Sequence, residues 1–366
     1  MKTVLANTIG TLKDREAALS DKEAFSFCGG NTGNVCFVDA VKEQLAYDAE
    51  ISCYKIDKYE DKAVFVLPAS NWINVDGHVL RDIFLPLENK DVQLAVLGLG
   101  VQIELNDNWD NFAREVEKNS DTIRALKIMS EHSQYIAVRG NITGEYLDKI
   151  GIHNWKVIGC PSFYEPFRQY GEARLKKASL DRAVINVTPG GDGEYKILSY
   201  GIQNRKPIIL QAMNDMPLTL WENRSIEDRH LQQKFPGLEG YTVNMVENYI
   251  KEFGHMFYTR DKWTEFLNKE NIQFSIGSRF HGNMMAFSNG IPAMWIVHDF
   301  RTKELVEAME LPYIQYRDLS RYSMDEIMNK CEYGHKFKAN YISMGRKYID
   351  FLDQCQINHN FKRERM

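Results

Sequence analysis

The sequence contains no long run of apolar residues and no large excess of one charge. No window approaches the roughly 20 apolar residues of a membrane-spanning helix, and the N-terminus has no sustained apolar stretch. We therefore expect a soluble, cytoplasmic protein that can still contact a membrane surface. The formal net charge is −5, with 45 Lys and Arg against 50 Asp and Glu, so nucleic acid is not an expected partner. Any basic site has to be local.

Cysteine is also sparse. None of the six cysteines lies in C-x-x-C spacing, which disfavours a zinc cage or a redox pair, and we predict no metal site. Reduced, mostly buried thiols of a cytosolic protein are the simpler interpretation. No internal repeat of solenoid length is present.

The length of 366 residues exceeds one ordinary compact core and fits two domains. Apolar runs such as residues 62–67 and 93–98 are typical of strands buried on both faces of a parallel sheet. Strand-like and helix-like segments alternate in both halves, as in doubly wound α/β proteins. We expect an N-terminal Rossmann-like domain over residues 1–175, joined by the C-terminal helix 337–366, and a C-terminal Rossmann-like domain over residues 176–336.

The N-terminal region contains a glycine-rich loop. We expect residues 1–24 to be helical, 24–28 to form a short strand, 29–34 to form the loop and 35–47 to form a helix. The glycines do not fall as G-x-G-x-x-G, which disfavours a dinucleotide-binding loop.

Polar side chains follow several of the expected strands. Loops after the strands of open α/β sheets line the ligand crevice, so Asn71 and Trp72 are candidate contacts, although a lone Trp more often packs in a core. Asn31 and Asn34 are candidates in the glycine-rich loop, but a tight turn that requires glycine explains that loop equally well. Arg139, after a further strand, either binds an anion or pairs with a surface acid.

The most informative stretch is residues 272–292, which predicts a strand, a loop and a short helix. A helix N-terminus attracts anions through its unpaired N–H groups, and Arg279 and His281 lie at this junction. In an extended loop, residues two apart point to the same side, so both side chains would converge on one ligand while Phe280 anchors the loop in the core. The alternative is that His281 caps the helix or lies in the core.

A second group of basic residues follows the strand expected at residues 291–297. It contains His298, Arg301 and Lys303. Lys303 is either an ordinary residue of a first helical turn or a sign of a nearby anion, because a cation near a helix N-terminus is electrostatically unfavourable. Two Rossmann-like halves with this basic junction late in the second half indicate a GT-B-like architecture with a cleft between the domains.

The segment Gly277-Ser278-Arg279-Phe280-His281-Gly282, followed by Gly290-Ile291-Pro292 and then Asp299 and Lys303, resembles the polysaccharide pyruvyl transferase family. Shorter matches in the family's order lie at residues 30–34, 97–100, 137–139 and 159–163.

The resemblance implies transfer of a pyruvyl group from phosphoenolpyruvate to two hydroxyls of one sugar, which forms a cyclic ketal in surface polysaccharide (exopolysaccharide) biosynthesis. Arg279 would then clamp the donor anion, because its planar fork suits carboxylate and phosphate, and His281 would contact phosphate or act as general acid or base. The further substrate-binding candidates are Gly282, Arg139, Lys303, His298, Asn31, Asn34, Asn71 and Trp72.

The same resemblance implies partners. Phosphoenolpyruvate is a donor substrate, so no separate cofactor is expected. The acceptor is a sugar or a lipid-linked oligosaccharide, and a lipid-linked acceptor would bring the protein to the inner face of the membrane. The basic run at residues 362–365 would be useful there, but a solvated tail explains it more simply.

Two other functions fit the sequence. A GT-B glycosyltransferase that uses a nucleotide sugar would hold a diphosphate at Arg279 and His281. A non-catalytic glycan-binding protein would keep the two domains but would not need His281.

Overall fold

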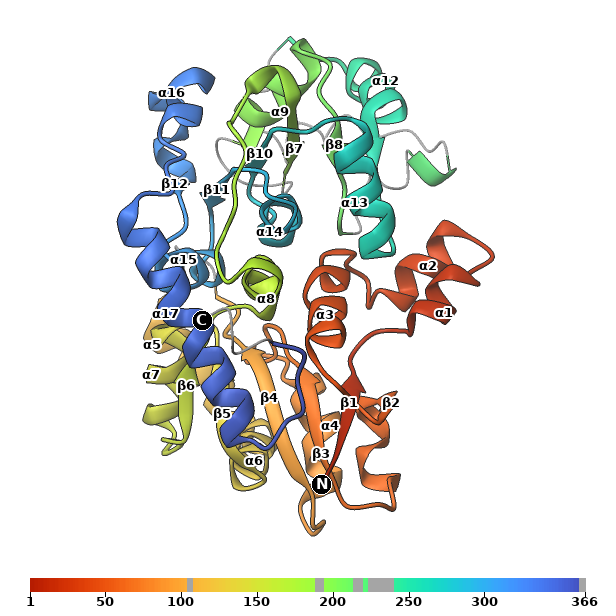
Figure 1. Ribbon diagram of the computed structural model, residues 1–366, viewed down its shortest axis with the longest axis vertical. Helices are drawn as coiled ribbons and strands as arrows, with labels where there is room; N and C mark the ends of the chain where they lie inside the picture. Colours follow the sequence, from red (N-terminus) through yellow and green to blue (C-terminus); the bar gives the residue numbers. More distant parts are fainter. Residues whose placement is uncertain (104–107, 188–193, 213–219, 223–239, 362–366) are drawn as a thin grey trace.

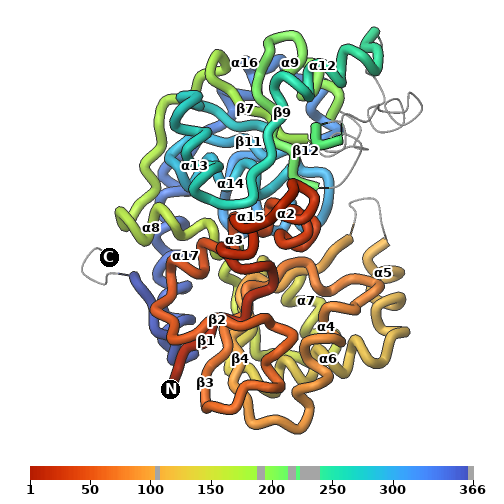
Figure 2. The backbone as a smooth tube through the Cα atoms, turned by 90° about the vertical axis from the view of Figure 1, so that its right-hand side faces the viewer, coloured from red at the N-terminus to blue at the C-terminus, as the bar shows by residue number. Residues whose placement is uncertain are grey.

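Two parallel six-stranded sheets with surrounding helices make up the protein (Figures 1 and 2). This confirms the predicted α/β class with two Rossmann-like domains in a GT-B-like arrangement. The computed structural model describes residues 1–103, 108–187, 194–212, 220–222 and 240–361. The basic run at residues 362–365 lies outside the described residues.

The first sheet has the strand order β2-β1-β3-β4-β5-β6, and each neighbouring pair is parallel. This is the flavodoxin-like order with one added edge strand. Its strands are β1 (Lys2–Asn7), β2 (Ala49–Ser52), β3 (Ala63–Pro68), β4 (Gln93–Leu99), β5 (Ser133–Val138) and β6 (Trp155–Val157).

The second sheet has the order β9-β8-β7-β10-β11-β12, which is the Rossmann order 3-2-1-4-5-6 counted from β7. All its described pairs are parallel. Its strands are β7 (Ala183–Asn186), β8 (Ile208–Ile209), β9 (Gly254–His255), β10 (Phe274–Gly277), β11 (Ala293–Val297) and β12 (Tyr313–Gln315).

Helices connect the strands in both halves. The first half contains α1 (Leu12–Glu16), α2 (Asp21–Phe27), α3 (Gly33–Gln44), α4 (His78–Phe84), α5 (Trp109–Glu117), α6 (Ser120–Glu131), α7 (Asn141–Lys149), the 3-10 helix η3 (Pro161–Tyr164) and α8 (Glu165–Tyr170). The second half contains α9 (Glu194–Gln203), α12 (Val243–Phe253), α13 (Arg260–Lys269), α14 (Phe280–Ser288), α15 (Phe300–Ala308), α16 (Met324–Asn329) and α17 (His335–Gln354). Among the described helices, none combines the length and the hydrophobicity that crossing a bilayer requires.

Two predictions near the N-terminus were wrong. Residues 2–7 form β1, a central strand rather than part of a helix, because pairing with β2 and β3 buries even the polar Thr3. Residues 24–27 belong to α2 rather than to a strand. The Ser20 side chain accepts a hydrogen bond from the Glu23 N–H, which starts that helix, and the buried Ala24 lies one helical turn before the buried Cys28.

Two short helices occupy the region between β4 and β5. They are α5 and α6, and the side chain of Asn119 accepts a hydrogen bond from the N–H of Thr122 to start α6.

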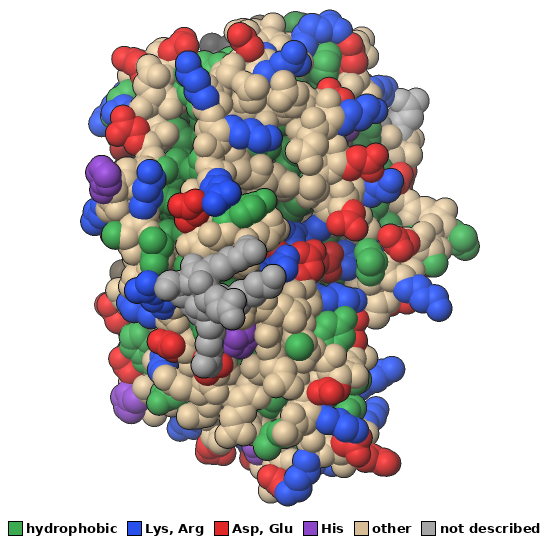
Figure 3. All heavy atoms as spheres, in the orientation of Figure 1, with side chains coloured by type: hydrophobic (Ala, Val, Ile, Leu, Met, Phe, Trp, Pro, Cys, Tyr) green, Lys and Arg blue, Asp and Glu red, His purple; other side chains and the backbone are tan. Residues whose placement is uncertain are grey.

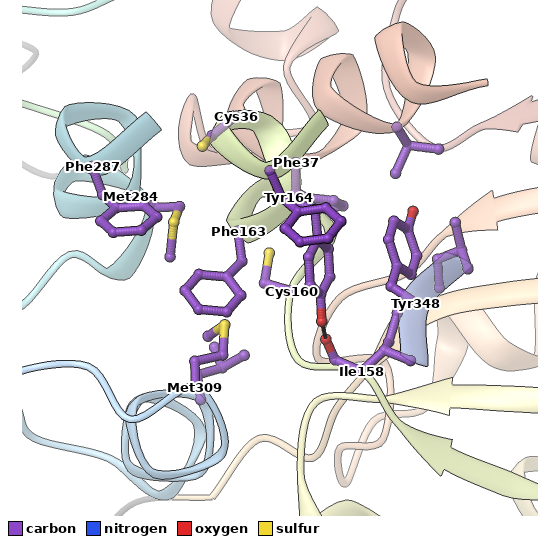
Figure 4. Close-up of a cluster of buried hydrophobic side chains, with 14 of the residues drawn as sticks. Cys36, Phe37, Ile158, Cys160, Phe163, Tyr164, Met284, Phe287, Met309 and Tyr348 are labelled. Carbon is purple, nitrogen blue, oxygen red and sulfur yellow. Dashed lines mark hydrogen bonds between the residues drawn. The ribbon is translucent and has the colours of Figure 1, made fainter. Parts of the chain in front are cut away.

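One hydrophobic core runs through both domains. Phe163 of η3 stacks on Phe287 of α14 with ring centroids 5.6 Å apart, and Figure 4 shows these rings beside Met284 of α14. Helix α17 lies along both domains in Figure 1. It packs on Phe287 through Phe337, and Tyr348 near its end donates a hydrogen bond to Gln44 of α3 (2.9 Å). The boundaries at residues 175 and 336 stay a prediction, because this core is common to both sides.

Ion pairs also join the two halves. Acidic and basic side chains gather at mid-height of the face in Figure 3. Arg260 at the start of α13 lies 3.0 Å from Glu43 of α3. Arg15 of α1 pairs with Asp39 of α3 and donates a hydrogen bond to the carbonyl oxygen of Tyr258 (2.7 Å). Helix α3 is therefore tied to the second domain by polar contacts as well as by the core.

The common core leads to a stability prediction. Phe163→Ala should lower the free energy of unfolding by about 3–5 kcal/mol, because it leaves a cavity between the domains. Urea denaturation, followed by tryptophan fluorescence and circular dichroism, should show one transition at lower urea. The control Leu19→Ala, at a side chain that is 95% exposed, should change that free energy by less than about 0.5 kcal/mol. A loss of less than about 1 kcal/mol in Phe163→Ala would show that this shared core contributes little to the free energy of unfolding.

Candidate active site

The Arg-x-His-Gly segment lies where the strand order of the second sheet reverses. The reversal falls between β7 and β10, and ligands of open α/β sheets bind outside the carboxyl ends of strands at this point. Asn186 at the end of β7 is the register partner of Gly277 at the end of β10. Arg279 follows two residues later, as the N-cap of α14.

A buried polar network fixes the backbone of this segment. The side chain of Asn186 accepts a hydrogen bond from the N–H of Arg279 (2.9 Å) and donates one to Asn283 Oδ1 (2.9 Å). Asn283 in turn donates to the carbonyl oxygen of Gly277 (2.8 Å). Position 277 requires glycine, since its φ is +155° and an added Cβ would lie 1.5 Å from the Asn186 carbonyl oxygen. The segment is therefore preorganised by protein contacts alone.

The prediction that Arg279 and His281 share one side of an extended loop was wrong. The helix begins immediately after Arg279, so His281 lies in its first turn, where residues two apart do not face each other. The predicted anchoring by Phe280 is confirmed, because its ring is 3% exposed and packs against Trp295. The Arg279 side chain extends toward the end of β7, with Nε 3.4 Å from the carbonyl oxygen of Val187.

His281 lies at the junction of the two domains. Its Nε2 is 3.5 Å from Sγ of Cys160, and its ring centroid is 5.1 Å from that of Phe37 in α3. The N-terminus of α3 also approaches closely, since a Cβ added to Gly33 would lie 3.3 Å from the Cβ of His281. Both domains thus contribute to the surroundings of this imidazole.

The surroundings of His281 determine its charge state. Burial lowers the pKa of His281 well below its usual range, and the positive charges of Arg139 and Arg301 lower it further. The imidazole is therefore neutral near pH 7, rather than titrating there. A neutral imidazole can accept a proton, and an anion that compensates the two arginines would raise its pKa.

Three arginines from three elements lie close enough for Arg301 to act electrostatically on the other two. Arg139 follows β5, Arg279 caps α14 and Arg301 belongs to α15. Burial lowers the pKa of both Arg139 and Arg279 to about 10, and the charge of Arg301 adds to the shift in each case. Arg301 Nε is buried without a hydrogen-bond partner among the described residues. This arrangement suits a ligand with more than one negative charge.

Arg139 is held firmly in place. It is 2% exposed, which excludes the alternative that it pairs with a surface acid. Its Nε donates to the carbonyl oxygen of Gly98 (2.9 Å), and its Nη1 donates to Oδ1 of Asn71. Two of the predicted substrate-binding residues, Asn71 and Arg139, are thus in direct contact.

The buried carboxyl group of Glu304 lies close enough to Arg139 for their charges to interact. Its oxygens accept hydrogen bonds from the N–H (2.6 Å) and the hydroxyl (2.9 Å) of Thr143. Burial raises the pKa of Glu304 to about 7, although these hydrogen bonds and Arg139 oppose the shift.

His298 lies beside the arginines. Asp299 starts α15 by accepting a hydrogen bond from the N–H of Thr302 (2.7 Å), and its other oxygen lies 3.2 Å from Arg301 and 3.6 Å from His298 Nε2. Burial lowers the pKa of His298, Asp299 opposes this, and Arg301 and Arg279 add to it. The Nδ1 atom of His298 is buried with no side-chain hydrogen-bond partner in the described part of the chain.

Three other predicted contacts have partners within the protein. Lys303 Nζ lies 4.0 Å from Glu307 one turn along α15, as in an ordinary helix-surface pair. Trp72 is 5% exposed and packs near Phe84, which favours the packing alternative. The side chain of Asn34 donates to the carbonyl oxygen of Cys28 (2.9 Å) at the end of α2.

The glycine-rich loop meets the second domain at Gln211, which sequence reasoning missed. Asn31 forms a β-bridge with Ala212, and its side chain accepts a hydrogen bond from the N–H of Gly33 (2.9 Å). The Gln211 amide nitrogen is buried without a hydrogen-bond partner among the described residues, and a Cβ added to Gly282 would lie 2.6 Å from it. Gln211 follows β8, and this post-strand position was the signal that could have identified it.

All six cysteines are free thiols. Within the described ranges, no group of three or more His, Cys, Asp and Glu side chains is arranged to hold a metal ion.

Comparison with known proteins identifies one family. Residues 31–299 match the family model described as polysaccharide pyruvyl transferase. No curated protein matches the chain.

Solved structures resemble the chain only weakly. An uncharacterized protein, KP1_0663 from Klebsiella pneumoniae subsp. pneumoniae NTUH-K2044, is 13% identical over 76% of this chain and 84% of its own, with a TM-score of 0.39. A putative UDP-N-acetylglucosamine 2-epimerase from Listeria monocytogenes is 10% identical over 97% and 96%, with a TM-score of 0.44. Anabaena Alr3699/HepE in complex with UDP is 9% identical over 97% and 100%, with a TM-score of 0.43. We draw no function from likenesses this low.

The buried Glu304 leads to a pH prediction. Its folded-state pKa of about 7 lies above the roughly 4.3 of an unfolded glutamate, so the folded protein binds this proton more tightly. The resulting stabilisation is complete below about pH 4.3 and is lost as the pH rises to about 7, by up to about 1 kcal/mol per pH unit. Glu304→Gln should remove this dependence of the free energy of unfolding on pH. Urea unfolding at pH 5, 6, 7 and 8 measures it, with the exposed Glu307→Gln as control; equal slopes in wild type and Glu304→Gln would contradict the assignment.

Proposed function

Because the chain belongs to the polysaccharide pyruvyl transferase family, we propose that it transfers a pyruvyl group from phosphoenolpyruvate to two hydroxyls of one sugar. The reaction forms a cyclic ketal, releases phosphate and takes place during surface polysaccharide assembly. Phosphoenolpyruvate is the donor substrate in this proposal, and no further cofactor takes part. The acceptor is a sugar or a lipid-linked oligosaccharide, which would bring the enzyme to the inner face of the membrane.

The observation that carries the proposal is the group of three arginines around the N-terminus of α14. The donor carries a carboxylate and a phosphate, and Arg139, Arg279 and Arg301 offer planar forks that bind such groups in a bidentate manner. The first N–H groups of α14 add an anion-attracting helix terminus. Arg279 and this helix terminus lie at the reversal point of the second sheet.

The chemistry requires proton transfers at several atoms. The CH₂ carbon of the donor gains a proton and becomes a methyl group, which leaves positive charge on the central carbon. One sugar hydroxyl forms a bond to this carbon, the bond from the carbon to the phosphate oxygen breaks, and the second hydroxyl closes the ring. Of the two hydroxyl protons, one balances the proton gained by the methyl group and the other leaves with phosphate.

His281 is the group we assign to these transfers. Its neutral state near pH 7 allows it to accept a hydroxyl proton. A bound donor would compensate the charges of Arg139 and Arg301, raise the pKa of His281 and let the same imidazole donate a proton. His281 is also next to Cys160 of the first domain, which is the side from which we expect the acceptor.

The direct test is phosphate release. Incubation with phosphoenolpyruvate and a panel of neutral glycans should release phosphate in step with a ketal methyl signal in the proton NMR spectrum of the product. Sugar nucleotides should remain intact. Consumption of a sugar nucleotide without donor-dependent phosphate release from any glycan mixture would refute the proposal and favour a glycosyltransferase.

His281→Ala supplies the control for this assay. It should lower kcat at least about 100-fold, the usual contribution of a general acid or base, while circular dichroism shows an intact fold. His153→Ala, at an exposed histidine that pairs with Asp148, should leave turnover unchanged. Full activity in His281→Ala would show that His281 does not carry out these proton transfers.

Arg279→Lys tests the donor clamp. Lysine keeps the charge but loses the fork, so KM for phosphoenolpyruvate should rise about tenfold, equivalent to about 1.4 kcal/mol, while KM for the acceptor stays constant. Arg174→Lys is the matched control, because Arg174 is exposed and pairs with Glu172. An unchanged donor KM in Arg279→Lys would show that Arg279 does not bind the donor.

A further inference from the structure

A cavity of about 650 Å³ opens in the first domain at the carboxyl ends of β1 and β2. Its size falls within the range of about 300–1,000 Å³ that is typical of small-molecule sites. Residues 7–11 and 50–55 form two of its walls, and residues from α2 and the loop after it form a third. In Figure 1, α1 and α2 lie above these strand ends.

The cavity lies beside the reversal point of the first sheet. The strand order of this sheet reverses between β1 and β3, and that is where such sheets bind their ligands. Thr8, which lines the cavity after β1, donates a hydrogen bond to the carbonyl oxygen of Pro68 at the end of β3 (3.2 Å). The first domain therefore has a ligand position equivalent to the one that the Arg-x-His-Gly segment occupies in the second domain.

The chemistry of the lining differs from that of the arginine cluster. Asp14 and Glu50 supply carboxylates, and Lys55 is the single cation among the residues that line the cavity. Hydroxyl groups come from residues such as Ser26 and Ser52. A ligand with a phosphate or carboxylate is disfavoured by the acids, whereas the hydroxyls of a neutral sugar both donate and accept hydrogen bonds.

Part of the lining is preorganised. Asn7, which is 4% exposed, donates to Glu50 Oε1 (2.7 Å), while Lys42 donates to Glu50 Oε2 (2.6 Å). Fixed side chains lose little entropy when a ligand binds. Tyr54 is half-exposed beside this polar floor, so its ring offers an apolar surface for the C–H groups of a sugar ring and its hydroxyl a polar one.

Short segments connect the cavity to the candidate active site. Gly29 lines the cavity, and Gly33, four residues later at the start of α3, approaches His281, where an added Cβ would lie 3.3 Å from the Cβ of the histidine. Likewise, Pro68 contacts the cavity residue Thr8, and Asn71 three residues later accepts a hydrogen bond from Arg139. The cavity is thus separated from the candidate active site by only a few residues along the chain, and its lining does not include the reacting groups.

We propose that this cavity binds a neutral sugar unit of the acceptor glycan, adjacent to the unit that receives the pyruvyl group. The assignment to an acceptor rests on the proposed pyruvyl transfer. A glycan that occupies both positions would place its reacting hydroxyls by means of a unit that takes no part in the chemistry.

Two substitutions at exposed positions test the cavity by turnover. Ser26→Trp fills it from α2, and Tyr54→Ala removes the ring at its rim. Each should raise KM for a neutral oligosaccharide acceptor about tenfold or more, whereas KM for phosphoenolpyruvate should stay constant. Ser320→Trp and Tyr170→Ala are the matched controls, because both side chains are exposed and lie outside this cavity. Unchanged acceptor KM values in both cavity variants would overturn the proposal.

A binding experiment without donor separates this proposal from the proposed function. Saturation-transfer NMR with maltose, lactose and cellobiose should detect at least one neutral disaccharide, and the signal should be lost in Ser26→Trp. Glucose 1-phosphate should give no signal that depends on Ser26. If no pyruvyl transfer is found but a disaccharide signal depends on the cavity, the sugar site stands and the transfer fails. Absence of any cavity-dependent disaccharide signal would overturn the sugar site, whatever the outcome of the transfer assay.

Discussion

The packing of α14 against α3 and η3 is the interaction on which the rest of the structure depends. The apolar side of α14 lies in the core that both domains share, through Met284 and Phe287. The N-terminus of the same helix carries Arg279 and His281. One nine-residue helix therefore joins the domains and supplies the central groups of the candidate site. Because the imidazole of His281 contacts both Phe37 and Cys160, its surroundings are complete only while the domains are packed.

This arrangement has an electrostatic cost in the absence of an anion. The pKa values of Arg139 and Arg279 lie below the usual range for arginine mainly because both are buried, and Arg301 adds repulsion. Glu194 and Asp299 compensate only part of this at Arg279. Concentrated buried charge of one sign is destabilising by itself, and it persists in folded proteins where the rest of the structure is stable enough to hold it. An anionic ligand would remove this cost on binding.

Features that depend on residues next to one another in the sequence could be predicted, whereas features that depend on distant residues could not. The apolar run at residues 93–98 and the strand, loop and helix around Arg279 were recognisable because each element carries its own pattern. The strand β1 was missed because pairing with β2 and β3, rather than local composition, buries it. The neutral state of His281 could not be predicted either, since it depends on Arg139 and Arg301, which are distant in sequence. Asn186 and Gln211 likewise gain their positions only from the tertiary fold.

The helix α17 has a mechanical consequence. It is one uninterrupted helix of 20 residues, about 30 Å long, and it packs on Phe287 near its start and on Gln44 near its end. Such a helix is stiff and contacts both domains, so the domains cannot separate by a simple hinge movement about a flexible linker. Any relative movement of the domains has to bend α17, rotate the domains about the axis of α17 or detach one end of α17 from its domain.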